Sequence, residues 1–506
     1  MSIIPSSSTA PITGAIRVDS ADQVAVALSD LTAGETVRLG GLELVLRDDI
    51  PKGHKLALVP IRSGEAVSKY GFRIGLATTD IAPGQHVHNH NLKTALTGLE
   101  DYVYAPEAPA TPRPAKGSFM GYKRNWGGDG HSVGIRNEIW VLCTVGCVAR
   151  TAERLARQAH ERFSGRVDGV YAITHPMGCS QLGDDLSHTR KLLASLASHP
   201  NAGAVLIVGL GCENNQLSEL IKLVDRPSDR FAYFAAQMVD DENEAGMAAL
   251  EALVTVAEKD RREPCDASDL VIGVKCGGSD AFSGLTANPV VGRIADKVAF
   301  AGGKAILSEI PEIFGAERQL MARARDRATF DGVVSVVNDF KAYFLEHNQP
   351  IFENPSPGNK AGGLTTLEEK SLGAVQKGGT SPLNDVLRYG ERVHTPGLSL
   401  LEAPGNDAVS STALTAAGAV MVLFTTGRGT PLGFPAPTVK IASNSALAAK
   451  KPHWIDFDAG VALDEGVEAA ADALMDRLFA IASGETCRNE INDEREIAIW
   501  KNGVTL

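Results

Sequence analysis

Four apolar runs in this sequence are each closely associated with a cysteine. Cys147 follows IWVLCTV, Cys179 follows GVYAITH, Cys212 follows AVLIVGL, and Cys276 ends LVIGVKC. If these runs are parallel strands, their carboxyl ends meet at one edge of a sheet, where open α/β sheets bind ligands. Thiolates are soft ligands for iron or zinc, and the absence of a CxxC pair excludes an ordinary zinc ribbon. The spacing therefore predicts a catalytic metal site assembled from distant loops.

The alternative is that these thiols are small packing groups, because free cysteine is among the most buried residue types. Cys143 lies inside its apolar run and is expected to pack in the core. Cys265 and Cys487 are expected to be linker or surface thiols. Cys276 has a second interpretation as the residue before a tight Gly-Gly turn.

A second group of potential ligands is GQHVHNHN, with His86, His88 and His90 at alternate positions. In a strand, alternate side chains point to the same face, so three imidazoles would lie together. Neutral imidazole binds iron, zinc or manganese. The alternative is an exposed polar strand end. His54, in the turn PKGHK, carries no functional prediction by itself.

Three glycine-rich polar segments offer groups that bind anions and hydroxyls. They contain Asn359 and Lys360, Asn406, and Arg428 between two glycines in FTTGRGTP. A guanidinium held close to the backbone by flanking glycines suits bidentate pairing with a carboxylate. The alternative for Gly-Arg-Gly is a simple turn.

Composition restricts the classes of partner. The chain has 506 residues, 44% of them hydrophobic, a net charge of -12 and a pI near 5.5. These values and the absence of a basic cluster argue against nucleic acid and anionic membranes as partners. No signal peptide or membrane span is evident, and seven dispersed cysteines indicate reduced thiols, so a cytoplasmic location is expected. Nucleotide-binding, zincin and serine-hydrolase motifs are absent.

The elements that would position these residues follow from the hydrophobic pattern. Residues 14–100 show short alternating runs with turns and predict a small β-rich domain, and 101–118 form a proline-rich extended linker. Beyond it, apolar runs alternate with amphipathic segments, which is typical of mainly parallel sheets covered by helices. A charged, turn-rich segment near 258–269 divides this region into α/β domains at 119–262 and 263–506. The fold class is α/β.

Taken together, these segments resemble the galactarate/altronate dehydratase family from about residue 15 to Leu506. The resemblance rests on long motifs: DDIPKGHKLAL, GQHVHNHN, VGIRNEIWVLCTVGCV, GCSQLGDD, CGGSDAFSGLTANP, ENPSPGNKAGG, APGNDAV and FTTGRGTP. It implies an N-terminal SAF-type β-clip domain followed by a catalytic body in two α/β parts. One departure is Ala374, where the altronate branch of the family has a cysteine, so no thiol ligand is expected at that position.

The resemblance also implies an activity, a hydro-lyase of hexuronate catabolism that dehydrates a sugar acid with Fe(2+), or Mn(2+) in its place. HVHNHN and GCSQLGDD favour D-altronate, converted to 2-dehydro-3-deoxy-D-gluconate. Removing the C2 proton beside a carboxylate requires a metal or cations to stabilise the charge that develops. The candidates for proton transfer are His175, His88 and Lys360. Those for substrate binding are Arg428, Arg136, Gln181, Asn359 and Asn406, and those for metal binding are Cys147, Cys179, Cys212, His86 and Cys276.

Several alternatives remain open at this stage. The substrate could be galactarate, another aldonate or a sulfonated hydroxy acid, or the protein could be a non-catalytic metal-binding or sugar-acid-sensing module. The three strand-end thiols could instead hold an iron-sulfur cluster with one open iron. A homodimer is the default expectation for a soluble enzyme of this size. The mechanism predicted here requires Cys147, Cys179 and Cys212 to meet in one cleft with Arg428.

Overall fold

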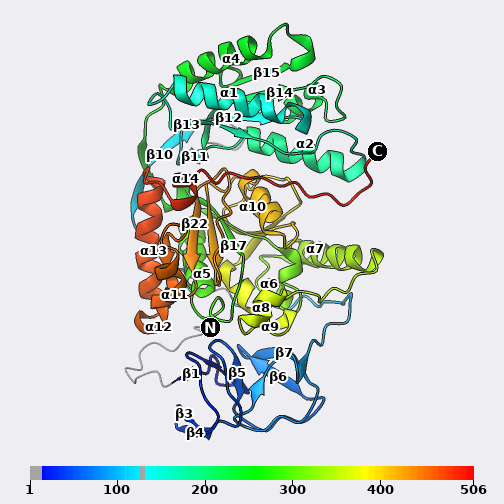
Figure 1. The fold of residues 1–506 in the computed structure, drawn as a ribbon, viewed down its shortest axis with the longest axis vertical. Helices are drawn as coiled ribbons and strands as arrows, with labels where there is room; N and C mark the ends of the chain where they lie inside the picture. Colours follow the sequence, from blue (N-terminus) through cyan, green and yellow to red (C-terminus); the bar gives the residue numbers. More distant parts are fainter. Residues whose placement is uncertain (1–13, 109, 125–131) are drawn as a thin grey trace.

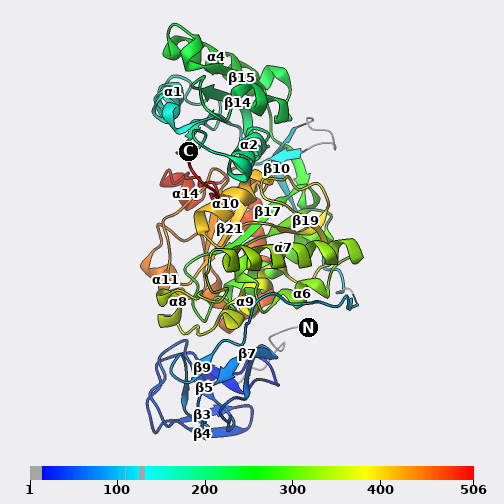
Figure 2. The ribbon, with the colours of Figure 1, turned by 90° about the vertical axis from the view of Figure 1, so that its right-hand side faces the viewer.

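The structure is a computed structural model that describes residues 14–108, 110–124 and 132–506. Three parts follow one another along the long axis of the molecule in both ribbon views (Figure 1 and Figure 2). A small β-domain lies at one end, a large C-terminal body lies in the middle, and a second α/β domain lies at the other end. None of the described helices is long and apolar enough to cross a membrane.

The β-domain consists of short antiparallel strands, as the alternating pattern predicts. One sheet has the order β1-β2-β5-β8 and a second has the order β6-β7-β9, while β3 and β4 form a hairpin. Their bounds are β1 (Ala15–Ile16), β2 (Val24–Ala27), β3 (Thr36–Leu39), β4 (Leu42–Val45), β5 (Lys55–Ala57), β6 (Ala66–Lys69), β7 (Phe72–Ala77), β8 (His86–Val87) and β9 (Leu92–Lys93). Strands this short need to pack against other elements to be stable. Apolar residues of the β-domain pack against the C-terminal body in one shared cluster.

The proline-rich segment connects the β-domain to the remainder as an extended strap. No helix or strand occurs between Lys93 and Ser118 at the positions that the structure describes. The strap is held along the body by backbone hydrogen bonds from Glu107 to Ala322 and from Ala115 to Lys297.

The second domain contains a parallel sheet of order β13-β12-β14-β15. Its strands are β12 (Glu138–Cys143), β13 (Gly169–Ile173), β14 (Ala202–Gly209) and β15 (Phe231–Ala235). Helices α1 (Ala149–Arg162) and α4 (Glu242–Ala257) cover one face, while α2 (Gly183–Ala197) covers the other and α3 (Leu217–Leu220) follows β14. Strand β14 is buried along its whole length because a parallel sheet has both faces covered.

A small antiparallel sheet joins the second domain to the body. It contains β10 (Ser118–Arg124), β11 (Ser132–Gly134) and β16 (Glu263–Asp266) in the order β11-β10-β16. The prediction that Cys265 is a linker thiol is wrong, because β16 places it opposite Phe119 and buries it. Cys487 is also buried rather than exposed, whereas Cys143 is buried as predicted.

The C-terminal body is built on a seven-stranded parallel sheet of order β19-β20-β18-β17-β21-β22-β23. The strands are β17 (Val271–Cys276), β18 (Lys304–Leu307), β19 (Leu383–Leu387), β20 (Gly397–Leu401), β21 (Met421–Thr426), β22 (Thr438–Ala442) and β23 (Phe457–Asp458). Parallel strands need crossover connections, which the alternating pattern of the sequence predicts. The mixed α/β class with a parallel sheet in the body is therefore confirmed.

Helices cover both faces of this sheet and extend toward both neighbouring parts. Apolar residues of α5 (Ala287–Phe300) and α13 (Val467–Ala482) pack on one face, and α10 (Asp407–Ala416) packs on the other. The same apolar cluster joins α10 to α2 of the second domain. The remaining helices are α6 (Glu317–Met321), α7 (Arg327–Glu346), α8 (Pro357–Ala361), α9 (Leu367–Ala374), α11 (Ser445–Lys450), α12 (Ala462–Glu465) and α14 (Arg488–Ile491).

The strand order of the body identifies its ligand-binding edge. The chain runs from β17 to β18, which lies on one side of β17. On the other side of β17 lies β21, and from β21 the chain runs to β22, in the opposite direction across the sheet. Ligands in open α/β sheets bind beyond the carboxyl ends of strands at such a reversal. The loops that follow β17 and β21, CGGSDAF and TTGRG, are therefore expected to line a site.

Candidate metal centre and active site

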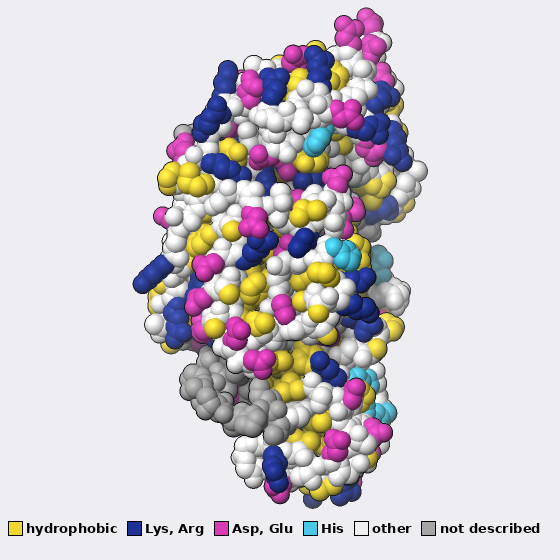
Figure 3. All heavy atoms as spheres, turned by 60° about the vertical axis from the view of Figure 1, so that its left-hand side comes forward, with side chains coloured by type: hydrophobic (Ala, Val, Ile, Leu, Met, Phe, Trp, Pro, Cys, Tyr) yellow, Lys and Arg dark blue, Asp and Glu magenta, His cyan; other side chains and the backbone are white. Residues whose placement is uncertain are grey.

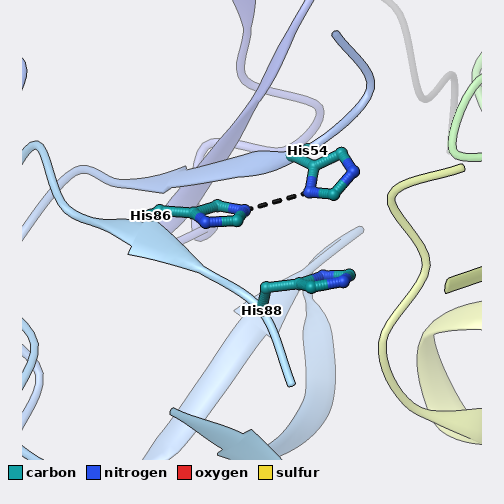
Figure 4. A group of neighbouring side chains, drawn as sticks. All are labelled: His54, His86 and His88. Carbon is teal, nitrogen blue, oxygen red and sulfur yellow. Dashed lines mark hydrogen bonds between the residues drawn. The ribbon is translucent and has the colours of Figure 1, made fainter. Parts of the chain in front are cut away.

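Three histidines of the β-domain lie together beside the body (Figure 4). His54 precedes β5 and His86 opens β8, and these two strands are antiparallel neighbours. The Nδ1 atom of His54 lies 3.0 Å from Nε2 of His86, and the rings of His86 and His88 stack with centroids 5.4 Å apart. One ligand nitrogen from each of the three lies within 4.8 Å of the other two. In the described ranges, no other group of three His, Cys, Asp or Glu side chains is arranged to hold a metal ion.

The electrostatic state of this histidine cluster suits a bound cation. Burial lowers the pKa of His54, lowers that of His86 to about 4 and lowers that of His88 to about 3. At neutral pH the imidazoles are therefore uncharged and offer lone pairs. The Nδ1 atom of His88 is buried without a hydrogen-bond partner, a condition that normally requires explanation. Neutral imidazoles with an unpaired buried nitrogen fit a divalent metal of the iron, manganese or zinc class.

The sequence analysis predicted this cluster in part. His86 and His88 are brought together, although β8 ends at Val87 and only a short part of the segment is strand. The exposed His90 lies at the margin, with its ring 5.4 Å from that of His86. His54 was missed because a single histidine in a turn gives no signal until the pairing of β5 with β8 is known.

The histidine cluster faces the loops at the ligand-binding edge of the body. The Nε2 atom of His54 lies 3.4 Å from the carbonyl oxygen of Ala361, the last residue of α8. Gly53 packs against Gly362 and Ala281, which lie on the two body loops nearest the cluster. Lys360 is half-buried in α8 beside Ala361. Space-filling Figure 3 shows histidine side chains on the β-domain near the body and charges of both signs interspersed across this face.

The loops after β17 and β21 meet around Asp280. Its carboxylate accepts hydrogen bonds from Ser283, Ser443 and Asn444, and burial raises its pKa. Gly427 packs directly against this carboxylate, where a Cβ would overlap it. The glycine therefore allows the TTGRG loop to lie on the CGGSDAF loop.

Arg428 is exposed at this edge. Its Nη1 donates one long hydrogen bond, 3.4 Å, to the carbonyl oxygen of Gly358 in α8. Asn359, one residue further, is buried, closes the N-terminal capping box of α8 and donates to the carbonyl oxygen of Ser279. Arg428, Asn359 and Lys360 thus belong to one region, and Asn359 acts there by fixing two loops.

A buried ionic network lies beneath these loops and was not predicted. Lys275 pairs with Glu309 and, at 2.8 Å, with Asp407. Lys370 pairs with Glu312 at 2.8 Å, and the second carboxylate oxygen of Glu312 is buried without a partner. Lysine and glutamate are common surface residues, so their burial is not visible in sequence. Cys276 also lies in this layer and contacts Ser279, with Sγ 2.6 Å from Oγ, and it joins no set of three close ligands.

The β-domain is fixed over the body by buried charges. Lys55 and Lys69 both pair with Glu369 of α9, at 2.9 Å and 2.8 Å, and all three side chains are 0% exposed. Burial raises the pKa of Glu369, but the two lysines outweigh it and hold that pKa well below its usual range. Lys55 directly follows His54, so the ion pair that docks the domain also positions the histidine cluster.

Three predicted metal ligands lie elsewhere. Cys147, Cys179 and Cys212 are exposed beyond the carboxyl ends of β12, β13 and β14 in the second domain. Figure 1 shows that the body separates this domain from the β-domain. The sequence predicted one cleft that contains the three thiols and Arg428. In this chain the thiols and Arg428 instead lie at two distant places.

Four further candidates have structural roles. Both ring nitrogens of His175 are engaged, by the Cys143 carbonyl at 2.9 Å and the Met177 amide at 3.1 Å, and burial lowers its pKa to about 4. Gln181 accepts from the Gly178 amide within its own loop. Asn406 caps α10 by accepting from two backbone amides. His175 and Gln181 belong to the second domain, whereas Asn406 follows β20 in the body, next to Asp407.

Arg136 is the fourth of these candidates. Its buried guanidinium pairs with both oxygens of Glu490, at 2.6 Å and 2.7 Å, and also donates to backbone carbonyls of residues 135, 481 and 485. A guanidinium has five N–H donors, and these contacts use its available directions. Arg136 therefore links the second domain to the C-terminal segment. Its guanidinium has no N–H groups left to bind a substrate carboxylate.

Comparison with protein-family models gives three consecutive matches. Residues 13–95 match the altronate/galactarate dehydratase SAF domain, 121–258 match the second domain of D-galactarate dehydratase/altronate hydrolase, and 267–505 match the C-terminal domain of D-galactarate/altronate dehydratase. These ranges correspond to the three parts of the fold.

Curated relatives match over nearly the full chain. Altronate dehydratase of Escherichia coli (strain K12) is 51% identical over 499 residues, covering 97% of this chain and 99% of the relative. Altronate dehydratase of Bacillus subtilis (strain 168) is 47% identical over 498 residues, with the same coverage. Galactarate dehydratase (L-threo-forming) of E. coli is 32% identical over 495 residues, covering 93% of each chain.

Proposed function

Because the chain belongs to the galactarate/altronate dehydratase family, we propose that it is a hydro-lyase that converts D-altronate to 2-dehydro-3-deoxy-D-gluconate. The observation that carries this proposal is near-full-length identity of 51% and 47% to two altronate dehydratases, against 32% to the galactarate enzyme. The histidine cluster beside Arg428 and Lys360 supplies a chemically suitable site. A non-catalytic sensor would need neither feature.

The histidine cluster is the proposed place for the divalent metal, Fe(2+) or Mn(2+). His54, His86 and His88 would hold it, since their neutral imidazoles and the unpaired Nδ1 of His88 fit such an ion. When bound, the metal supplies Lewis acidity that stabilises negative charge developing on the substrate.

Arg428 is proposed to bind the substrate carboxylate. Its guanidinium is exposed, and its only hydrogen bond to the described residues is the long one to Gly358, so the fork is available for two parallel hydrogen bonds. Asp280, whose pKa is raised by burial, lies under the same loops and fixes them through Ser443 and Asn444. This arrangement orients the carboxylate toward the junction with the β-domain.

Lys360 is the remaining candidate for proton transfer at C2. His175 is remote and fully engaged, and His88 is assigned to the metal set. Lys360 stands in α8 next to Ala361, the residue that contacts His54. In the reaction one proton leaves C2 and hydroxide leaves C3 to form water, and the resulting enol becomes the 2-keto product, so one acid and one base function suffice.

The proposal is tested with a panel of sugar acids. The purified protein is assayed anaerobically with Fe(2+) and a reductant, and 2-keto acid formation is measured from D-altronate, galactarate and other aldonates. We expect D-altronate to give the highest kcat/KM. A preference of tenfold or more for galactarate, about 1.4 kcal/mol, would reverse the substrate assignment.

Arg428→Lys gives a residue-level prediction. We expect kcat/KM for D-altronate to fall at least tenfold, about 1.4 kcal/mol, because an ammonium cannot replace the bidentate fork. Steady-state kinetics measure the change, with the exposed Arg73→Lys as a matched control that should behave as wild type. Retention of full kcat/KM by Arg428→Lys would remove Arg428 from the substrate site.

The cellular setting is proposed on general grounds. The described cysteines are all free, which supports a reducing compartment such as the cytoplasm. A homodimer is proposed because closed two-fold assemblies are common among soluble enzymes.

A further inference from the structure

Three exposed cysteines in the second domain have no role in the proposed dehydration. Cys147, Cys179 and Cys212 follow β12, β13 and β14, which are adjacent in the order β13-β12-β14. All three thiols are exposed, so they are not packing residues. Three exposed thiols from three separate loops at one sheet edge are available to bind a shared ligand.

Direct hydrogen bonds join the three cysteine loops. Gly146 N donates to Met177 O at 2.9 Å, which links the Cys147 loop to the Cys179 loop. Asn215 N donates to Gly178 O at 3.0 Å, which links the Cys212 loop to the same segment. In each of these two hydrogen bonds, the donor and the acceptor lie within three residues of two different cysteines. The loops therefore form one assembly.

Side-chain contacts complete this assembly. Asn214 accepts from Ser180 N at 2.7 Å, and Asn215 donates to Thr144 O at 3.1 Å. Gly178 has φ +100°, and a Cβ there would overlap the Thr144 carbonyl, so only glycine allows the Cys179 loop to approach β12 this closely. The loop is also anchored from the C-terminus, because Leu506 N donates to Ser180 O at 3.0 Å.

In the described residues, Cys147, Cys179 and Cys212 do not belong to a group of three side chains that could hold one metal ion. Ligands of one ion must converge on one point, whereas thiolates of an iron–sulfur cluster bind different irons and stand further apart. Helices α1 and α2 begin just after Cys147 and Cys179, and their N-terminal dipoles favour a negatively charged group here.

We propose that Cys147, Cys179 and Cys212 bind a [4Fe–4S] cluster on the second domain, separate from the histidine cluster. Three thiolates leave one iron of the cluster without a cysteine ligand. Gln237 donates to the Cys212 sulfur at 3.6 Å, the type of N–H···S contact that adjusts cluster potential. The proposal does not rest on the dehydration or on the metal at the histidine cluster.

The test is cluster content after anaerobic reconstitution with Fe(2+) and sulfide. The wild-type chain is expected to show broad visible absorption and to hold about four sulfides and at least about four irons. The variant Cys147→Ser/Cys179→Ser/Cys212→Ser is expected to lose the absorption and the sulfide. His86→Ala is expected to keep both, which separates the cluster from the histidine site.

Cys265→Ser is the matched control, because its thiol is buried away from this edge and its variant should reconstitute as wild type does. Circular dichroism establishes that each variant is folded, and Cys212→Ser alone provides a milder change that should reduce the sulfide content. A wild-type protein that remains colourless and free of sulfide after reconstitution would overturn the proposal. Undiminished sulfide in the folded triple variant would do the same.

Discussion

His88→Ala is expected to lower kcat for D-altronate at least about 100-fold and to remove most of the bound Fe(2+). Loss of groups that merely support metal ligands typically costs 10- to 100-fold in affinity or activity, so loss of a ligand should cost no less. His88 supplies one of three imidazoles whose nitrogens lie within 4.8 Å, and its Nδ1 has no other partner. Iron content and steady-state kinetics measure the two effects.

His90→Ala is the control for this prediction. Its ring lies 5.4 Å from that of His86, yet it is exposed and outside the set of three. We expect it to retain iron and activity within about twofold of wild type. If His88→Ala kept full activity and normal iron content, the metal would have to bind elsewhere.

Glu369→Gln is expected to lower the free energy of unfolding by about 3–5 kcal/mol, the usual cost of breaking a buried ion pair on one side. The amide leaves Lys55 and Lys69 buried without their common carboxylate. Because these lysines belong to the β-domain and Glu369 belongs to the body, the change should also loosen the docking of the histidine cluster. Denaturant unfolding measures the stability, and limited proteolysis of the strap measures the docking.

The pH dependence follows from the depressed pKa of Glu369. Burial raises this pKa, but Lys55 and Lys69 hold it below its ordinary value of 4.5, so the folded state binds the proton less tightly than the unfolded state. The resulting stability is fully present above pH 4.5 and is lost as the pH falls through the folded pKa. The difference in stability between wild type and Glu369→Gln should therefore shrink at acid pH.

Two further variants test this interpretation. The exposed Glu465→Gln is the matched control and should change the unfolding free energy by less than about 0.5 kcal/mol. An apolar triple replacement, Lys55→Met/Lys69→Met/Glu369→Leu, should recover much of the loss, since it leaves no buried charge. A Glu369→Gln protein as stable as wild type would show that the ion triad does not hold the β-domain in place.

Local pattern was sufficient to predict most secondary structure of the catalytic part. The apolar runs that become β12, β14, β17 and β21 are short and bounded by glycine or polar turns, a pattern typical of buried parallel strands. Residues spaced three or four positions apart, as on one face of a helix, are buried together: Val148, Ala152, Leu155, Ala159 and Phe163. These features depend on neighbours a few residues apart, which sequence displays directly.

Some of the candidates selected by residue type and turn chemistry lie in one region. His86, His88, Lys360 and Arg428 all lie near the junction of the β-domain with the body. Residue type suggested Arg136 for substrate binding and His175 for proton transfer, but the side chains of both are engaged in buried hydrogen bonds. Sequence does not reveal whether a polar group already has a partner.

By itself, then, the sequence determined the α/β class, the strand ends and the chemical types available for a metal and a sugar acid. Only the tertiary structure decided which of these groups share a site. It joined His54 to His86 through the pairing of β5 with β8, and it separated the thiols of the second domain from Arg428. The physical reason is that buried charges such as Lys55 with Glu369 and long-range strand pairing set these distances, and both act between residues far apart in the chain.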